Sequence, residues 1–71
     1  MNLQPARNNP NLNDLDREVL DVIGDREAFD AQGYPDQRVV KAIAERLNRD
    51  TNDVYYSLKA LRVYCSAERR R

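Results

Sequence analysis

The sequence predicts an all-α fold in which three short amphipathic helices pack into one domain. A chain of 71 residues is long enough for one domain at most. Apolar residues recur at helical spacing in three segments, and glycine, proline or short polar runs separate these segments. No segment has the pattern of a strand, and no repeat is present. Because each expected helix has only one apolar stripe, the three must pack together to bury those stripes.

Residues 1–12 are predicted to form a flexible N-terminal arm. They hold two of the three prolines, Pro5 and Pro10, which exclude a regular helix. They also hold four of the seven asparagines. Chain termini are usually disordered unless they are tied down, so we expect a tail, with an arm that reaches a partner as the alternative.

The first helix is expected over residues 14–24. Asn13 is a good N-cap, and the acidic residues of the first turn favour the positive end of the helix dipole. The apolar residues that repeat at helical spacing are Leu15, Val19, Val22 and Ile23, and Leu20 flanks them. Gly24 is the first expected stop, although the helix has the alternative of continuing to Phe29.

A loop, "DAQGYPD", precedes the second helix because Gly33 and Pro35 interrupt it. Asp36 is the expected cap of this helix, and Asn48, which tolerates a left-handed backbone, is its expected end. Its buried stripe is formed by Val39 or Val40, then Ile43, Ala44 and Leu47.

The third helix follows the polar turn "RDTND", with Asp50 or Thr51 as its N-cap. Its apolar stripe has steps of four, three and four and consists of Val54, Leu58, Leu61 and Cys65. We expect this helix to reach Ser66 or Ala67.

Residues 13–62 resemble the helix-turn-helix superfamily, in particular its winged-helix branch. "LDREVLDVI" resembles the first helix, "VVKAIAERL" the second, and "NDVYYSLKALR" the recognition helix. The small Ala44 suits the close crossing of the last two helices in that family. A wing would need a glycine and a β-hairpin, and "RVYCSAERRR" has neither, so the resemblance implies at most a vestigial wing. Residues 63–71 are left as an extension of the third helix or a basic tail.

The composition argues against catalysis. The chain has no histidine and one cysteine, Cys65, so a His/Cys metal site and an intrachain disulfide are excluded. We expect no enzyme activity, no cofactor and no small-molecule substrate. No apolar run is long enough for a membrane span and no signal peptide is apparent, so a cytoplasmic location without membrane contact is expected.

The charge is zero overall but unevenly distributed. Residues 14–30 hold seven acidic and two basic residues, net −5, whereas residues 48–71 hold three acidic and six basic residues, net +3. A helix turn of about 100° per residue places Asn52, Tyr56, Lys59 and Val63 opposite the core stripe. These side chains suit base edges and phosphates, and we expect double-stranded DNA as the partner of a transcriptional regulator of bacterial or phage type. The candidate DNA-binding residues are Arg38, Arg49, Thr51, Asn52, Tyr55, Tyr56, Lys59 and Arg62, with Arg69, Arg70 and Arg71 as further phosphate contacts.

The alternative function is a protein-interaction module on the same frame, binding another regulator or RNA polymerase without DNA. Asp50 and Asp53 lie at the helix end that would approach phosphates, which opposes DNA binding. Tyr56, Val63 and Tyr64 would form the apolar contact surface. A homodimer through residues 61–67 is a further expectation, because so small a DNA reader covers few base pairs.

Overall fold

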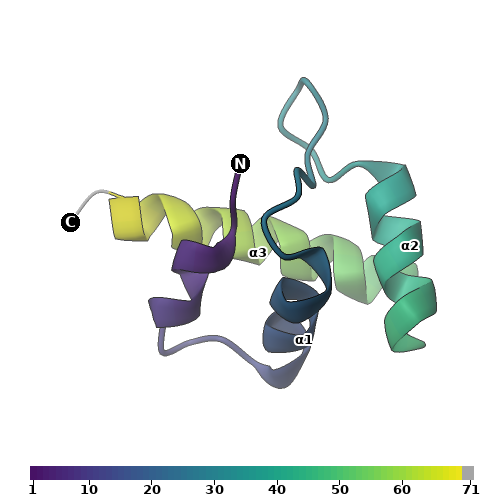
Figure 1. Ribbon diagram of the computed structural model, residues 1–71, viewed down its shortest axis with the longest axis horizontal. Coiled ribbons are helices and arrows are strands. Elements are labelled where there is room, and N and C mark those ends of the chain that lie inside the picture. Colours follow the sequence, from purple (N-terminus) through teal and green to yellow (C-terminus); the bar gives the residue numbers. More distant parts are fainter. Residues whose placement is uncertain (70–71) are drawn as a thin grey trace.

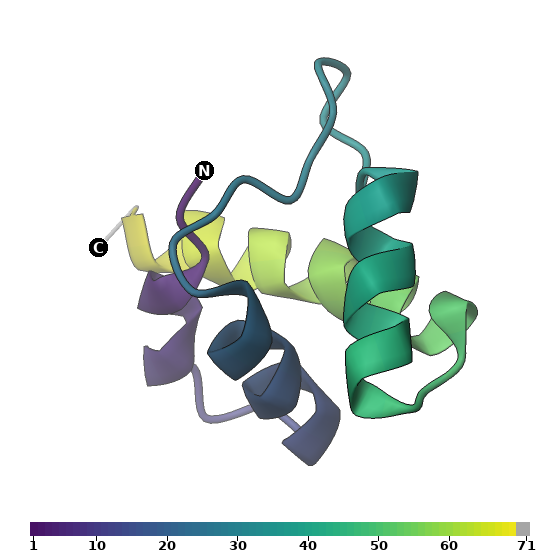
Figure 2. The same ribbon diagram turned by 45° about the vertical axis from the view of Figure 1, so that its right-hand side comes forward.

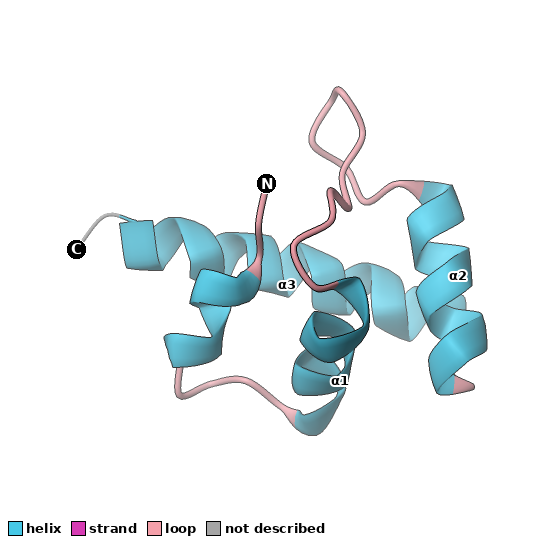
Figure 3. Ribbon diagram, viewed as in Figure 1, coloured by secondary structure: helices cyan, strands magenta, loops and turns pink. Residues whose placement is uncertain are grey.

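Three α-helices and one 3-10 helix make up most of the chain. The computed structural model describes the backbone of residues 1–69 and the side chains of residues 1–68. The elements in order are η1 (Gln4–Asn8), α1 (Asp14–Ile23), α2 (Gln37–Leu47) and α3 (Thr51–Arg69). Figure 3 shows loops between them and no strand within the described part. The predicted all-α fold with three α-helices is confirmed.

The long helix α3 is the element on which the other three are assembled. Its 19 residues span roughly 28 Å at 1.5 Å per residue. Figures 1 and 2 show η1, α1 and α2 distributed along one side of α3, with α2 near its start and η1 near its end. The opposite side of α3 is left without a covering element in the described part of the chain.

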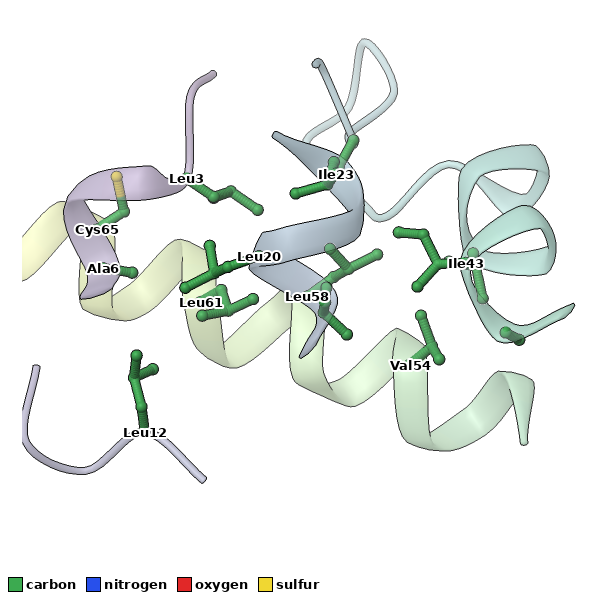
Figure 4. Packing of buried hydrophobic residues seen from close by; sticks show 14 residues of the cluster. Leu3, Ala6, Leu12, Leu20, Ile23, Ile43, Val54, Leu58, Leu61 and Cys65 are labelled. Atoms are coloured by element: carbon green, nitrogen blue, oxygen red, sulfur yellow. The ribbon is translucent and has the colours of Figure 1, made fainter. Parts of the chain in front are cut away.

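The core lies between α3 and these three elements. Every residue of the predicted α3 stripe, which is Val54, Leu58, Leu61 and Cys65, has 0% of its surface exposed. Figure 4 shows this stripe with Leu20 and Ile23 of α1 and Ile43 of α2 on the facing side. The burial of aliphatic side chains from all the helices in one cluster is what holds so short a chain together.

The helix ends follow the caps expected from the sequence. The Asn13 side chain accepts a hydrogen bond from the backbone N–H of Asp16, and the Asp16 side chain accepts one from Asn13, which completes a capping box. Asp36 caps α2 by accepting from the N–H of Arg38. Asn48 ends α2 in the left-handed conformation, with φ of 54°. This residue lets the chain reverse into α3 after two further residues.

The first twelve residues correct the expectation of a flexible arm. Leu3 and Ala6 have 0% exposure, because η1 packs on the C-terminal half of α3. Gln4 Nε2 donates to the carbonyl oxygens of Leu20 and Gly24 at 2.9 and 2.7 Å. Pro5 excludes an α-helix interior but fits the first turn of a 3-10 helix, where its missing N–H is not needed. Burial of Leu3 and these hydrogen bonds fix the segment.

Two boundaries that the sequence left open are now defined. Helix α1 ends at Ile23, and Gly24 follows with φ of 60°, so the alternative extension to Phe29 is not adopted. Helix α3 continues through Arg69, beyond the expected end at Ser66 or Ala67. The expected phosphate contacts of Arg70 and Arg71, and of the Arg69 side chain, lie outside the described residues.

Candidate nucleic-acid interface

One side of α3 has no neighbouring element in the described part of the chain. Asn52, Tyr56, Lys59 and Val63 all lie on it and are exposed, as the helical spacing predicted. Tyr56 and Val63 are each 66% exposed, which is unusual for large apolar or aromatic side chains. We refer to the surface formed by these four residues as the α3 face.

Two tyrosines at the start of this face have different roles. Tyr55 is half-buried and packs against the core, whereas Tyr56 points to solvent. Their rings meet edge to face with centroids 5.5 Å apart, a favourable arrangement. Lys59 Nζ lies 5.7 Å from the centroid of the Tyr55 ring, in cation–π contact. Tyr55 therefore supports the side chains of Tyr56 and Lys59, and these two are left to contact a partner.

Arg62, a predicted DNA contact, is held by the loop between α1 and α2. Its Nη1 donates a hydrogen bond to the carbonyl oxygen of Gly33. Its guanidinium carbon lies 5.5 Å from the centroid of the Phe29 ring. The loop is itself ordered by an isolated antiparallel bridge between Phe29 and Pro35. The main contact of Arg62 is thus internal, and it joins the loop to α3.

The two remaining predicted arginines also lie apart from the α3 face. Arg49 Nη2 is 3.6 Å from a carboxylate oxygen of Glu18 in α1. Arg38 lies at the start of α2, where it lines a hollow shared with α1, and its Nη2 is 3.4 Å from Asp36 Oδ2. The structure therefore brings Asn52, Tyr56 and Lys59 together on the α3 face, with Thr51, Tyr55 and Arg62 on its flank. Arg38 and Arg49 lie outside α3.

Acidic groups surround the N-terminal end of α3. Asp50 Oδ1 accepts a 2.7 Å hydrogen bond from the N–H of Asn52, which is the N-cap role expected for Asp50 or Thr51. Asp53 is exposed in the first turn of the helix. Lys59 is the one basic residue of the α3 face, so with Asp50 and Asp53 the charge of this region is slightly negative.

A shallow hollow of about 280 Å³ lies beside the α3 face, between α3 and the start of α1. Leu15, Ala60 and Tyr64 contribute apolar surface to it, and Tyr56 forms one edge. At its base the Ser57 hydroxyl donates to Asp16 Oδ1 at 2.6 Å. This buried pair was not predicted from the sequence, although the spacing of Asn13 and Asp16 signals the capping box that orients Asp16.

Comparison with known protein families, with curated proteins and with solved structures finds no match for this chain. Within residues 1–69, no helix has both the length and the apolar character needed to cross a lipid bilayer.

Proposed function

We propose that this protein binds double-stranded DNA as a small transcriptional regulator of the helix-turn-helix type, with α3 entering the major groove. One observation carries the proposal. Helix α3 follows α2 through a short turn at the left-handed Asn48, and its α3 face is free along the helix while three elements hold its other side. A major groove accepts an exposed helix of this kind.

The three polar residues of the α3 face each have a role in this proposal. Asn52 has the donor and acceptor needed to pair with an adenine edge, and it lies in the first turn, where recognition helices usually reach the bases. Lys59 meets a guanine edge or a phosphate, and the Tyr56 hydroxyl donates to a phosphate oxygen. Thr51 is a further phosphate donor at the helix start. Binding, and not catalysis, is the proposed activity, and a cytoplasmic location goes with it.

A second candidate function is binding of a protein partner through the same face. The observation that favours it is the exposure of Tyr56 and Val63, 66% each, next to the hollow lined by Leu15 and Tyr64. Arg49 and Arg62, which DNA binding would use, have internal partners. A second copy of this chain is one such partner, since Val63 and Tyr64 lie in the segment expected to self-associate.

A gel-shift titration on random double-stranded DNA at low and high salt, with molar mass measured on the same sample, tests the proposal. DNA binding predicts retention at low salt that weakens steeply as salt rises, because phosphate contacts release counterions. Tyr56→Ala should weaken that retention. No retention at low ionic strength, together with a concentration-dependent mass that Tyr56→Ala abolishes, would show that the α3 face binds protein instead.

A further inference from the structure

A groove separates α1 from α2 on the side of the molecule away from the α3 face. Each of these helices packs more extensively on α3 than on the other, so their outer edges diverge. The hollow between them has a volume of about 660 Å³. Its floor is aliphatic and consists of Val22, Ile23, Val39, Ala42 and Ile43.

The floor is partly open to solvent. Ile23 and Ile43 are buried at its base, Val22 and Val39 are half-buried, and Ala42 is exposed. Val22, Val39 and Ala42 lie at the edges of the two apolar stripes, and packing in the core leaves part of their surface exposed. An aliphatic strip between two diverging helices is the kind of groove into which a further helix packs its apolar side chains.

The charges around the groove indicate the chemistry of that helix. Three arginines line it: Arg26 at the end of α1, and Arg38 and Arg46 on α2. Arg26 donates to the carbonyl oxygens of Val22 and Ile23, which fixes its guanidinium at the rim. Within residues 1–69, no hydrogen bond or ion pair engages the side chain of Arg46. Within the same range, the guanidinium of Arg38 has one polar partner, Asp36 Oδ2 at 3.4 Å.

Two acidic residues also line the groove, but they offset these arginines only in part. Glu27 is engaged by the N-terminal ammonium group of Met1, and this hydrogen bond lowers the pKa of Glu27. At about 100° per residue, Arg46 lies almost in line with Val39 along α2, whereas Arg38 and Glu45 are turned about 100° and 120° away from that line, to the same side. Arg38 and Glu45 therefore offset each other at one rim of the groove, and Arg46 makes the strip of α2 beside Val39 basic.

We propose that this groove binds a short amphipathic helix of a partner protein, with aliphatic side chains on one face and acidic side chains beside them. The groove runs along α2 from Arg38 to Arg46, roughly 12 Å at 1.5 Å per residue, so about two turns of the partner helix contact it. Its aliphatic residues cover Val22, Val39 and Ala42, and a carboxylate beside them pairs with Arg46. None of these residues belongs to the α3 face, so the groove and that face bind their ligands independently.

The test uses a fluorescent designed peptide of about 16 residues, long enough to be helical, with leucines on one face and glutamates flanking them. Binding to the full chain is followed by anisotropy and by methyl chemical shifts of Val22, Val39 and Ala42. Arg46→Glu should weaken binding roughly tenfold or more, since it turns an attraction into a repulsion. Lys41→Glu is the matched control: it makes the same charge change on α2, about 140° round the helix from Arg46 and outside the groove.

A second variant distinguishes packing of the peptide in the groove from attraction between its charge and that of the protein. Ala42→Arg adds a positive charge but fills the floor, so the groove predicts weaker binding, whereas attraction by charge alone predicts tighter binding. Equal affinity for a lysine version of the peptide, shifts confined to α3, or equal effects of Arg46→Glu and Lys41→Glu would each overturn the proposal. So would the absence of binding at millimolar peptide. Gel shifts on the same variants keep this test separate from DNA binding, which Ala42→Arg should leave in place.

Discussion

The hydroxyl of Ser57 on α3 donates a 2.6 Å hydrogen bond to Oδ1 of Asp16 on α1, and both side chains are buried. The other carboxylate oxygen of Asp16 accepts from the backbone N–H of Asn13 at 3.2 Å. One carboxylate therefore fixes the start of α1 and joins it to the middle of α3. Because α3 presents the proposed binding face, this pair sets how that face is oriented on the rest of the fold.

Removing the Ser57 hydroxyl should lower the free energy of unfolding more than replacing a serine elsewhere on the helix does. Ser57→Ala leaves a buried carboxylate oxygen without its partner, and we expect a loss of about 1–3 kcal/mol in the free energy of unfolding. Ser66→Ala, on the same helix and away from Asp16, is the control and should change stability little. Urea denaturation of both variants measures the difference. Equal midpoints for the two would mean that the hydrogen bond does not contribute to stability.

Leu58 tests the packing of the core on α3. It is fully buried at the centre of the stripe, and Leu58→Ala should cost about 2–5 kcal/mol, which approaches the whole stability of so small a domain. Val63→Ala removes apolar atoms from the same helix, but on its exposed side, and should cost far less. Thermal melts of the two variants provide the measurement. A Leu58→Ala protein that melts near the wild-type temperature would contradict this arrangement of the helices.

The parts of the fold that were predicted correctly depend on short stretches of sequence. The stripe from Val54 to Cys65 follows from helical periodicity, and the cap at Asp36 and the left-handed Asn48 follow from the preferences of single residues. The exposure of Asn52, Tyr56 and Lys59 follows from the same helical periodicity. These features need no knowledge of distant residues.

The features that were missed depend on contacts between distant residues. Leu3 is buried because η1 packs on α3, and two prolines in the segment gave no sign of that contact. The hydrogen bond from Arg62 to the carbonyl oxygen of Gly33 joins residues 29 positions apart, and no pattern in the sequence indicated it. The groove was missed because Val22 and Val39 looked like ordinary core residues, and only the divergence of α1 and α2 leaves them partly open.

Gly33 has a backbone conformation that disfavours a side chain, and an added Cβ would displace the Arg62 guanidinium. Its φ is 88°, and a Cβ there would lie 2.6 Å from Arg62 Nη1. Gly24, with φ of 60° and no atom within 4 Å of an added Cβ, isolates the backbone effect. Both alanine variants should lose roughly 1–3 kcal/mol from backbone strain, but only Gly33→Ala should move the NMR signals of the Arg62 guanidinium and the Phe29 ring. Unchanged signals in Gly33→Ala would argue against the contact between the loop and α3.

The cap of α2 gives a prediction about pH. The backbone N–H of Arg38, followed by its side chain, lowers the pKa of Asp36 below the ordinary value of 3.8. Because this pKa is lowered in the folded protein, the ionised Asp36 carboxylate contributes fully to the free energy of unfolding above pH 3.8. That contribution is lost as the pH falls through the lowered pKa. Asp36→Asn keeps a good N-cap without a titrating group, so it should lose less stability than the wild type in that acidic range. Urea midpoints measured from neutral to acidic pH test this, and parallel curves for the two proteins would refute it.

The charged residues on and beside the α3 face lead to the most specific prediction about DNA affinity. Asp53 repels phosphates from the helix end that must approach them, so Asp53→Asn should tighten binding to every sequence. Asp25→Asn makes the same change in net charge in the loop after α1 and should have a much smaller effect. Lys59→Ala should weaken binding and reduce its dependence on salt if the amine meets a phosphate, whereas Asn52→Ala should relax preference at one base pair by about 1–3 kcal/mol. Fluorescence anisotropy measures the DNA affinity of the wild type and of all four variants, on a selected operator and its single-base variants, at two salt concentrations. If Asp53→Asn and Asp25→Asn tighten binding equally, DNA responds to the total charge of the protein, and α3 is not the element that reads it.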